Sequence, residues 1–304
     1  MKRLLLKTHL PPGDIMTLTV AIESLHNQYP GKYLTGVNTL HQEIFHNNPW
    51  ITKMREDKTV EVINMEYSSI HKSNSTATSF INGYTEFLAQ KLQISIVPIA
   101  NHPVLYLEDK EKEWISQVQE IVGKKIPFWI VNAGIKTDFT NKSWPVEYYQ
   151  EVVDKTKDRI QWVQIGSQHD THPTLKNVIN LVGKTSLREL IRLVWHASGG
   201  LGPVTLLQHV CAAWERPYMC LVGGREPLQW IQYPVQTTFH TLGQFDCCKT
   251  QACWKSRVVK QGRVDDEKNH SLCELPVLGM SRASPRCMVS ITPTEVSTVI
   301  RKYL

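Results

Sequence analysis

The sequence predicts an α/β fold built from two parallel sheets in tandem. Strand-like apolar runs alternate with helix-like segments along most of the chain. Each half opens with a strand followed by a glycine-containing loop, first at Arg3–Thr8 and again at Phe128–Asn132. With 304 residues, of which 41% are hydrophobic, the chain is long enough to give two domains a core each. We therefore expect a ligand-binding cleft between the two halves.

The first predicted domain covers residues 1–122. Ile15, Leu18, Ala21, Ile22 and Leu25 recur at the spacing of a helix that follows the first strand. The other expected strands and helices of this domain are Tyr33–Val37, Thr59–Ile63, Phe80–Gln93 and Trp114–Val122. The charged run 108–113 and residues 123–125 are predicted to cross between the halves.

The second predicted domain covers residues 123–304. After Phe128–Asn132 its expected strands are Ile160–Ile165, Val178–Leu181, Ser198–Leu201 and Tyr218–Val222. Its expected helices are Val146–Lys157, Leu187–His196 and Val204–Trp214. Residues 245–290 are irregular and rich in cysteine, and they have too little apolar content to pack alone. A last helix begins at Pro293, where Thr292 and Glu295 have the spacing of a capping box.

Composition predicts a soluble, cytoplasmic protein. No apolar run approaches the roughly 20 residues of a membrane span, and the apolar stretch within Met1–Lys7 is too short for a signal peptide. The net charge of +6 suits a phosphorylated ligand or an anionic membrane face, but it is also common in proteins that bind neither. It is compatible with peripheral membrane association, and no nucleic-acid partner is expected.

The segment Gly199–Gly224 is predicted to bind a diphosphate. Small residues precede Pro203, which suits the first position of a helix because it lacks the N–H that would be unpaired there. The free N–H groups of such a helix start, together with its dipole, bind phosphate well. His209 lies about two turns further along the helix, where it is either a donor-binding residue or a hydrogen-bonded core histidine. The candidate donor-binding residues here are Gly202, Pro203, Val204, Thr205 and His209.

Asp14 is the candidate catalytic base. It follows Gly13 at the end of the first strand, on the side where parallel sheets bind their ligands. The competing interpretation is that Asp14 is the N-cap of the next helix, because aspartate is among the favoured capping residues.

Two further loops carry candidate donor-binding residues. Lys142 lies in a polar loop that follows the first strand of the second sheet, and Trp144 is expected to fix this loop by packing. In a later loop Arg225 is a candidate phosphate clamp and Glu226 a candidate acceptor from sugar hydroxyls. The alternatives are a solvated Lys142 and a surface ion pair between Arg225 and Glu226.

Five of the seven cysteines fall in the last fifth of the chain. Because a reducing compartment disfavours disulfides, this cluster predicts a structural zinc or iron ion held by four of the five thiolates. The spacing is wider than a standard zinc signature, and scattered free thiols are the alternative. The candidate ligands are Cys247, Cys248, Cys253, Cys273 and Cys287.

In this order, the features resemble the family 9 glycosyltransferases, the ADP-heptose lipopolysaccharide heptosyltransferase group. Gly13-Asp14 and the helix that follows look like the family's glycine-aspartate motif, and Lys142-Ser143-Trp144-Pro145 matches its Lys-x-Trp-Pro motif. The other matching segments are Asn48–Ile51, Asn180–Leu190 and His209 with Ala212-Ala213.

The resemblance implies a GT-B fold of two Rossmann-like domains and an inverting sugar transfer that needs no catalytic metal. By this resemblance Asp14 is the general base on the acceptor hydroxyl, Lys142 holds the donor diphosphate, and Thr205 and His209 belong to the nucleotide loop. The implied partners are a nucleotide-diphosphate sugar, such as ADP-heptose, and a glycan or protein acceptor. A homo-oligomer is compatible with this reading.

The sequence departs from the family in two places. Gly202-Pro203-Val204-Thr205 stands where the family has Asp-Thr-Gly, so this chain has no carboxylate there. The cysteine-rich tail, above all Cys287–Thr292, looks more like the iron-binding finger of bacterial autotransporter heptosyltransferases. Two rival functions stay open from sequence: a nucleotide-sugar epimerase, and a non-catalytic nucleotide-binding scaffold that uses the cysteine finger to bind a partner.

Overall fold

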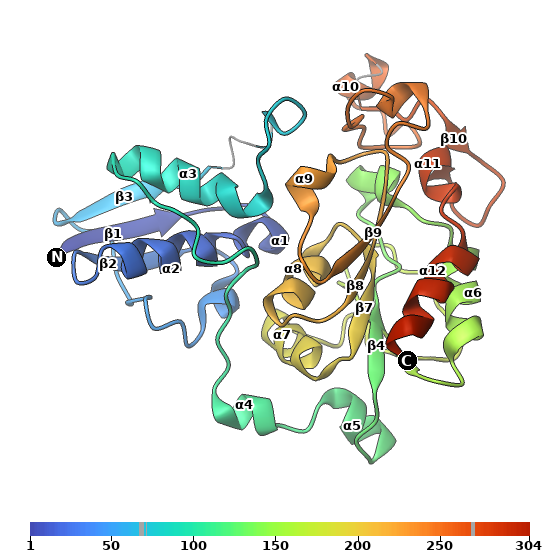
Figure 1. Ribbon diagram of the computed structural model, residues 1–304, viewed down its shortest axis with the longest axis horizontal. Coiled ribbons are helices and arrows are strands. Elements are labelled where there is room, and N and C mark those ends of the chain that lie inside the picture. The colour runs from blue at the N-terminus through green and yellow to red at the C-terminus, as the bar shows by residue number, and fades with distance from the viewer. Residues whose placement is uncertain (67–69, 71, 269–270) are drawn as a thin grey trace.

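The computed structural model describes residues 1–66, 70, 72–268 and 271–304, and it contains two parallel sheets, one in each half of the molecule (Figure 1). Within these residues, the first sheet has the strand order β2-β1-β3 and the second the order β6-β5-β4-β7-β8-β9. Every strand pair in both sheets is parallel. The predicted α/β class is therefore confirmed.

The central strand of the first sheet is β1 (Lys2–Lys7), which pairs with β2 (Tyr33–Asn38) and β3 (Val60–Asn64). Leu4, Leu5 and Leu6 of this strand are all buried, as expected for a parallel strand covered on both faces. The chain leaves β1 through the short helix α1 (Pro12–Ile15). The other helices of this half are α2 (Leu18–Gln28), α3 (Phe80–Leu92) and the 3₁₀ turn η1 (Gln42–Phe45).

The second sheet is built around β4 (Phe128–Val131), whose four residues are buried. Its other strands are β5 (Gln161–Gln164), β6 (Val178–Asn180), β7 (Gly199–Pro203), β8 (Tyr218–Gly223) and β9 (Gln236–His240). Its helices are α6 (Val146–Thr156), α7 (Leu187–His196), α8 (Leu206–Ala213) and α9 (Leu228–Ile231). The C-terminal helix α12 (Pro293–Ile300) packs beside α6, and the 3₁₀ turn η5 (Arg301–Tyr303) follows it.

Two short helices, α4 (Asp109–Glu113) and α5 (Gln117–Val122), connect the halves where the sequence predicted one helix from Trp114 to Val122 (Figure 1). Arg188 of α7 holds this connection in place. Its Nε donates to Glu111 at 2.8 Å and its Nη2 donates to the carbonyl of Tyr106 at 2.9 Å.

The prediction that Pro203 starts a helix is wrong. Pro203 is the last residue of β7, Thr205 is the N-cap, and α8 begins at Leu206. Pairing with β4 already ends at Leu201, so a residue without an N–H is tolerated at this point of the strand. The carbonyl of Pro203 accepts a hydrogen bond from the hydroxyl of Tyr218 at 2.7 Å.

The cysteine-rich segment contains only short elements in its described part. They are η4 (Asp246–Cys248), α10 (Val264–Glu267), β10 (Pro276–Val277), β11 (Ser284–Pro285) and α11 (Arg286–Val289). A buried arginine holds part of it together, because Arg257 donates to Asp266 at 2.6 Å and to Ser271 at 2.8 Å. No helix among the described residues is long and apolar enough to cross a bilayer.

Candidate functional site

The candidate site lies where the carboxyl ends of three neighbouring strands of the second sheet face α1 of the first half. Lys142 ends the 3₁₀ segment η3 (Thr137–Lys142) after β4, Thr205 follows β7, and Glu226 follows β8. Helix α1, which carries Asp14, packs against α8. The fold thus brings loops from both halves together at one place.

Lys142 is an anchored residue, since its ammonium has two partners. Its Nζ lies 2.8 Å from Oε1 of Glu226 and donates to the carbonyl of Val204 at 3.0 Å. The side chain is 20% exposed, so the alternative of a freely solvated loop lysine is wrong. Two residues further on, Trp144 is fully buried and its indole donates to the carbonyl of Ile291 at 3.0 Å, which fixes the loop.

Burial and ion pairing compete at this pair of charges. Burial lowers the pKa of Lys142, and the attraction of Glu226 opposes the shift only in part. Burial acts to raise the pKa of Glu226, but Lys142 and Arg225 outweigh it and leave this pKa below its ordinary value. Glu226 is therefore an ionised, buried carboxylate shared by two cations.

Arg225 and Glu226 form an ion pair, but it is not the surface pair that the sequence allowed. Both residues are buried, at 5% and 4% exposed. The guanidinium of Arg225 donates through Nε to the carbonyl of Lys255 at 2.8 Å and lies 5.2 Å from the ring of Trp254. The cysteine-rich segment therefore holds this donor-side loop in place.

Asp14 does not cap a helix, because it is the third residue of α1 and the N-cap position is Pro11, which makes no side-chain cap bond. The N-cap interpretation is thus wrong. Burial raises the pKa of Asp14, while Lys142 and then Lys136 act to lower it. A carboxylate of the first half and a lysine of the second are therefore electrostatically coupled across the cleft.

The start of α8 lies directly against the glycine loop of the first half. A Cβ at Gly13 would lie 3.5 Å from the backbone nitrogen of Leu206 and 3.5 Å from Cδ2 of His209. His209 is 3% exposed, and its Nδ1 is 2.7 Å from the hydroxyl of Tyr233. Burial lowers its pKa to about 3, with Lys142 adding to the effect. His209 is consequently a neutral residue packed behind the cleft, in the environment of a hydrogen-bonded core histidine.

The end of β7 is tightly packed. A Cβ at Gly202 would lie 2.8 Å from the hydroxyl of Tyr218, so this position favours glycine. Thr205 accepts a hydrogen bond from the amide of Asn132 at 3.3 Å, and Val204 is buried with its carbonyl facing Lys142. The loop of this strand end is thus bound to the loop that follows β4.

Sequence and fold together identify the family of this chain. Residues 48–256 match the glycosyltransferase family 9 (heptosyltransferase). The chain belongs to this family. No curated protein sequence matches it. The family 9 enzymes are glycosyltransferases, and the predicted enzyme class is confirmed.

Solved structures share the fold at low sequence identity. The glycosyl transferase family 9 protein from Veillonella parvula DSM 2008 has a TM-score of 0.69 at 14% identity, over 99% of this chain and 97% of that one. ADP-heptose lps heptosyltransferase II from E. coli has 0.62 at 15%, over 100% and 98%. The dodecameric iron-containing heptosyltransferase TibC of enterotoxigenic E. coli H10407, in complex with ADP-D-beta-D-heptose, has 0.63 at 14%, over 99% and 76%. The GT-B fold is thereby confirmed.

The five clustered cysteines of this family 9 chain line one small cavity. The space measures about 10 Å³, which is room for a single atom or water. Its other lining residues include two cations and one carboxylate; they are Asn141, Gly224, Phe245, Lys255, Glu274, Leu275 and Arg286. All seven cysteines of the chain are free thiols. Burial raises the pKa of Cys247 and of Cys287 to about 12 each.

These thiols are not a ready-made metal site. Among the described residues, no group of three or more His, Cys, Asp or Glu side chains is placed to hold a metal ion. A metal would require the sulfurs to turn further into the cavity and to lose their protons.

The sequence analysis missed His172, which lies over the carboxyl ends of β4 and β5. A Cβ at Gly134 or at Gly166 would fall 1.9 Å from its ring, and both ring nitrogens lack a hydrogen-bond partner among the described residues. Nearby, Arg282 donates to the carbonyl of Ala133 at 3.2 Å. Gly166 directly follows the predicted strand Ile160–Ile165, and Gly134 lies two residues after the predicted strand Phe128–Asn132. These two glycines were the available signal for this part of the site.

Proposed function

We propose that this family 9 glycosyltransferase moves a heptose or related sugar from a nucleotide diphosphate to a hydroxyl group of a glycan or protein, with inversion at the anomeric carbon. The proposal rests above all on one observation. Asp14 of the first half and Lys142 of the second are near enough for each to shift the other's pKa, and a Cβ at the neighbouring Gly13 would lie 3.5 Å from the backbone nitrogen of Leu206 in the second half. We propose that this carboxylate and this ammonium flank the place where the sugar is transferred.

In the proposed reaction the acceptor oxygen attacks the anomeric carbon of the donor while Asp14 takes the hydroxyl proton. The new C–O bond forms as the bond from the anomeric carbon to the phosphate oxygen breaks, and the electron pair leaves with the diphosphate. Lys142 and Arg225 stabilise the negative charge that develops there, and the first amides of α8 add to this effect. Raising the pKa of Asp14 by burial makes its carboxylate a stronger base than an exposed aspartate. We propose that these cations make a catalytic metal unnecessary.

The donor is proposed to be ADP-heptose or a related nucleotide sugar. TibC, which shares the fold, binds ADP-D-beta-D-heptose. In this chain the diphosphate would have to compete with Glu226 for Lys142, because the two residues are paired at 2.8 Å. We retain six further candidate donor-binding residues: Gly13, Gly202, Pro203, Val204, Thr205 and His209. His209 is buried, so it would act by packing against its neighbours.

A structural zinc or iron ion is proposed for the cysteine cavity. The cavity has room for one ion and not for a cluster of several, and five thiols border it. TibC is an iron-containing protein, which favours iron. Bound metal would stabilise the segment that contacts the 223–226 loop, since Cys253 donates its N–H to the carbonyl of Gly224 at 3.1 Å.

The products test the function against its rivals. Purified protein is incubated with a panel of nucleotide sugars and hydroxyl-bearing acceptors, after a thermal-shift screen that selects the donors which raise Tm. The proposal predicts a glycosylated acceptor whose anomeric configuration, read by NMR, is opposite to that of the donor. An isomerised donor or free sugar without acceptor would establish an epimerase, and donor binding without any turnover would establish a scaffold.

We also propose a domain division, a cellular location and an assembly state for this chain. We retain the division of the chain at residue 122/123, with the first half binding the acceptor and the second the donor. A cytoplasmic location, peripheral membrane association and a homo-oligomer are also retained as predictions.

A further inference from the structure

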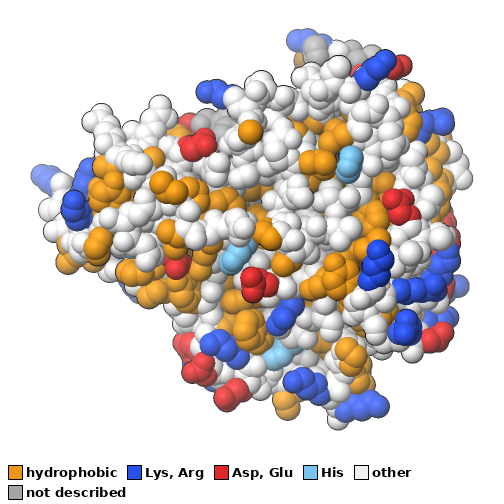
Figure 2. Space-filling model, in the orientation of Figure 1, with side chains coloured by type: hydrophobic (Ala, Val, Ile, Leu, Met, Phe, Trp, Pro, Cys, Tyr) orange, Lys and Arg blue, Asp and Glu red, His pale blue; other side chains and the backbone are white. Residues whose placement is uncertain are grey.

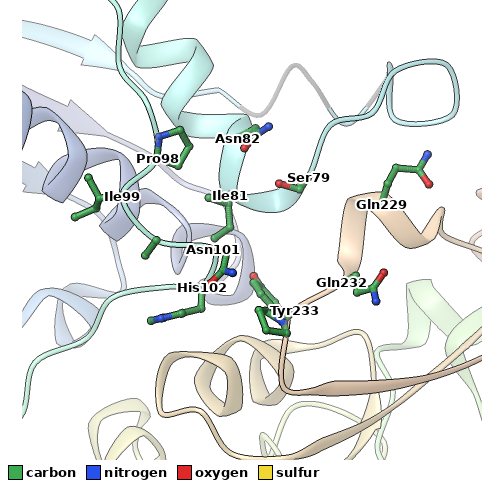
Figure 3. A pocket seen from close by; sticks show the side chains of 12 residues that line it. Ser79, Ile81, Asn82, Pro98, Ile99, Asn101, His102, Gln229, Gln232 and Tyr233 are labelled. Atoms are coloured by element: carbon green, nitrogen blue, oxygen red, sulfur yellow. The ribbon is translucent and has the colours of Figure 1, made fainter.

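A hollow lies between the two halves of the molecule, beside the residues around Asp14. It is a cavity of about 860 Å³ bordered by the start of α3 and residues 98–102 on one side, and by α9 and residues 232–234 on the other (Figure 3). Aromatic rings connect this hollow with the residues around Asp14: Tyr233 lines the hollow, and its hydroxyl is 2.7 Å from Nδ1 of His209. The ring of Phe80 lies 4.8 Å from that of His209 and 5.0 Å from that of Trp230.

The lining of this cavity is polar, and His102 is its one histidine. Its twelve lining residues include no Lys, Arg, Asp or Glu. Four of them are carboxamides that project from both halves: Asn82, Asn101, Gln229 and Gln232 (Figure 3). Figure 2 shows the same distribution of charge: on this face of the molecule Lys and Arg gather along the α6 and α12 side, and few charged side chains border α3 and α9.

Most of these carboxamides have hydrogen-bonding capacity to spare. The side chains of Asn82, Asn101 and Gln232 make no hydrogen bond to another described residue; Asn82 is half-buried, and Asn101 and Gln232 are exposed to solvent. Gln229 uses its amide to donate to the carbonyl of Ser73 at 2.8 Å and keeps its own oxygen free for a ligand. Each carboxamide both donates and accepts, so the set matches groups that do the same.

Apolar surfaces lie between the carboxamides. Ile81 is 5% exposed, and Pro98, Pro234 and the ring of Tyr233 also line the space. A sugar ring presents hydroxyl groups at its edge and C–H groups on its faces, which suit this alternation. The lining holds no Lys or Arg to pair with a diphosphate, and the start of α3 is the feature of this cavity that would attract an anion.

We propose that this cavity binds an uncharged, hydroxyl-rich carbohydrate, which is a neutral glycan segment of the acceptor. The assignment as part of the acceptor rests on the proposed transferase function; the assignment as a neutral-carbohydrate site rests on the lining alone. The cavity would thus hold sugar residues next to the one whose hydroxyl reacts near Asp14.

The test uses the full-length protein without nucleotide sugar, on an array of neutral and of anionic oligosaccharides. The double variant Asn82→Leu with Gln232→Leu removes two carboxamides at nearly constant volume, and Gln90→Leu, on the exposed far end of α3, is the matched control. We expect the wild-type protein and the control to bind neutral glycans, and the double variant to bind them at least tenfold more weakly. Nucleotide-sugar affinity, measured in parallel, should stay within twofold in all three proteins and thereby report intact folding.

Binding of no neutral glycan by the wild-type protein overturns the proposal. So does a preference for anionic glycans, or equal binding by the double variant. A wild-type protein that binds neutral glycans but transfers no sugar from any donor contradicts the proposed function and leaves the carbohydrate site standing. If transfer occurs and the double variant keeps an unchanged acceptor KM, the acceptor assignment is overturned.

Discussion

Replacing Lys142 by Met should separate catalysis from folding. The substitution removes the ammonium that lies 2.8 Å from Glu226 and 3.0 Å from the carbonyl of Val204, and it keeps an unbranched apolar stem of similar length. Glu226 does not become an orphaned buried charge, because Arg225 remains its partner. The substitution should therefore change the free energy of unfolding and kcat by different amounts.

For stability, breaking a buried ion pair outright costs about 3–5 kcal/mol. Because Arg225 still compensates Glu226, we expect the free energy of unfolding to fall by only about 1–2 kcal/mol, well below that range. For turnover, a lost group that stabilises developing negative charge costs about 10²–10³ in kcat, or about 2.7–4 kcal/mol. Catalysis should therefore suffer more than folding.

The assay measures kcat, the donor dissociation constant by calorimetry, and urea unfolding on the same preparations. Lys142→Arg keeps the charge and should recover part of the activity, whereas Lys157→Met, on an exposed side chain at the end of α6, should change nothing. A Lys142→Met variant that is folded and turns over within threefold of wild type would refute the assignment of Lys142 to the departing diphosphate.

The other predictions concern pH, packing and metal. Because burial raises the pKa of Asp14, activity should fall as the pH drops through a value above the ordinary 3.8, and an acid limb at or below 3.8 in a kcat/KM profile would contradict this. Burial also makes the ionised Asp14 carboxylate destabilise the folded state at neutral pH, so Asp14→Asn should raise Tm at pH 7. This increase in Tm should vanish below about pH 4, where Asp14 is protonated in the folded and in the unfolded protein. A Cβ at Gly224 would lie 2.6 Å from Sγ of Cys248, so Gly224→Ala should lower the free energy of unfolding by about 1–3 kcal/mol. The control Lys249→Ala, at an exposed position, should leave the free energy of unfolding unchanged. Equal urea midpoints for Gly224→Ala and the wild-type protein would exclude this clash. Protein that was never exposed to a chelator should contain one zinc or iron ion per chain, and its Tm should fall when the metal is removed. Elemental analysis that finds well below one metal ion per chain would contradict the metal proposal.

Much of the fold could be predicted because its strands and amphipathic helices carry local signals. Ser186 and Glu189 form the capping box that begins α7, and this helix ends at the predicted residue His196. Strand β9 was missed because Gln236–His240 is mostly polar. Pro203 was misplaced because its position depends on where β4 stops pairing, which is a property of the sheet and not of the local sequence.

The candidate site was predictable in its parts but not in its connections. Asp14 and Lys142 each follow the first strand of a half, and such positions meet ligands in α/β folds. The burial of Arg225 and Glu226 against residues 253–255 joins segments that no local pattern relates. The same holds for the carboxamides at 82 and 232, which line one cavity only after the halves pack together.

The most direct test of the account is the rate of sugar transfer by Asp14→Asn under single-turnover conditions, with donor affinity measured on the same protein. General-base catalysis contributes about 10²–10⁴ in rate, so the variant should lose at least 100-fold while binding the donor within threefold of wild type. Asp158→Asn, at an exposed position after α6, should transfer at the wild-type rate. Full retained transfer by the Asp14 variant would contradict the assignment of the base and with it the proposed mechanism.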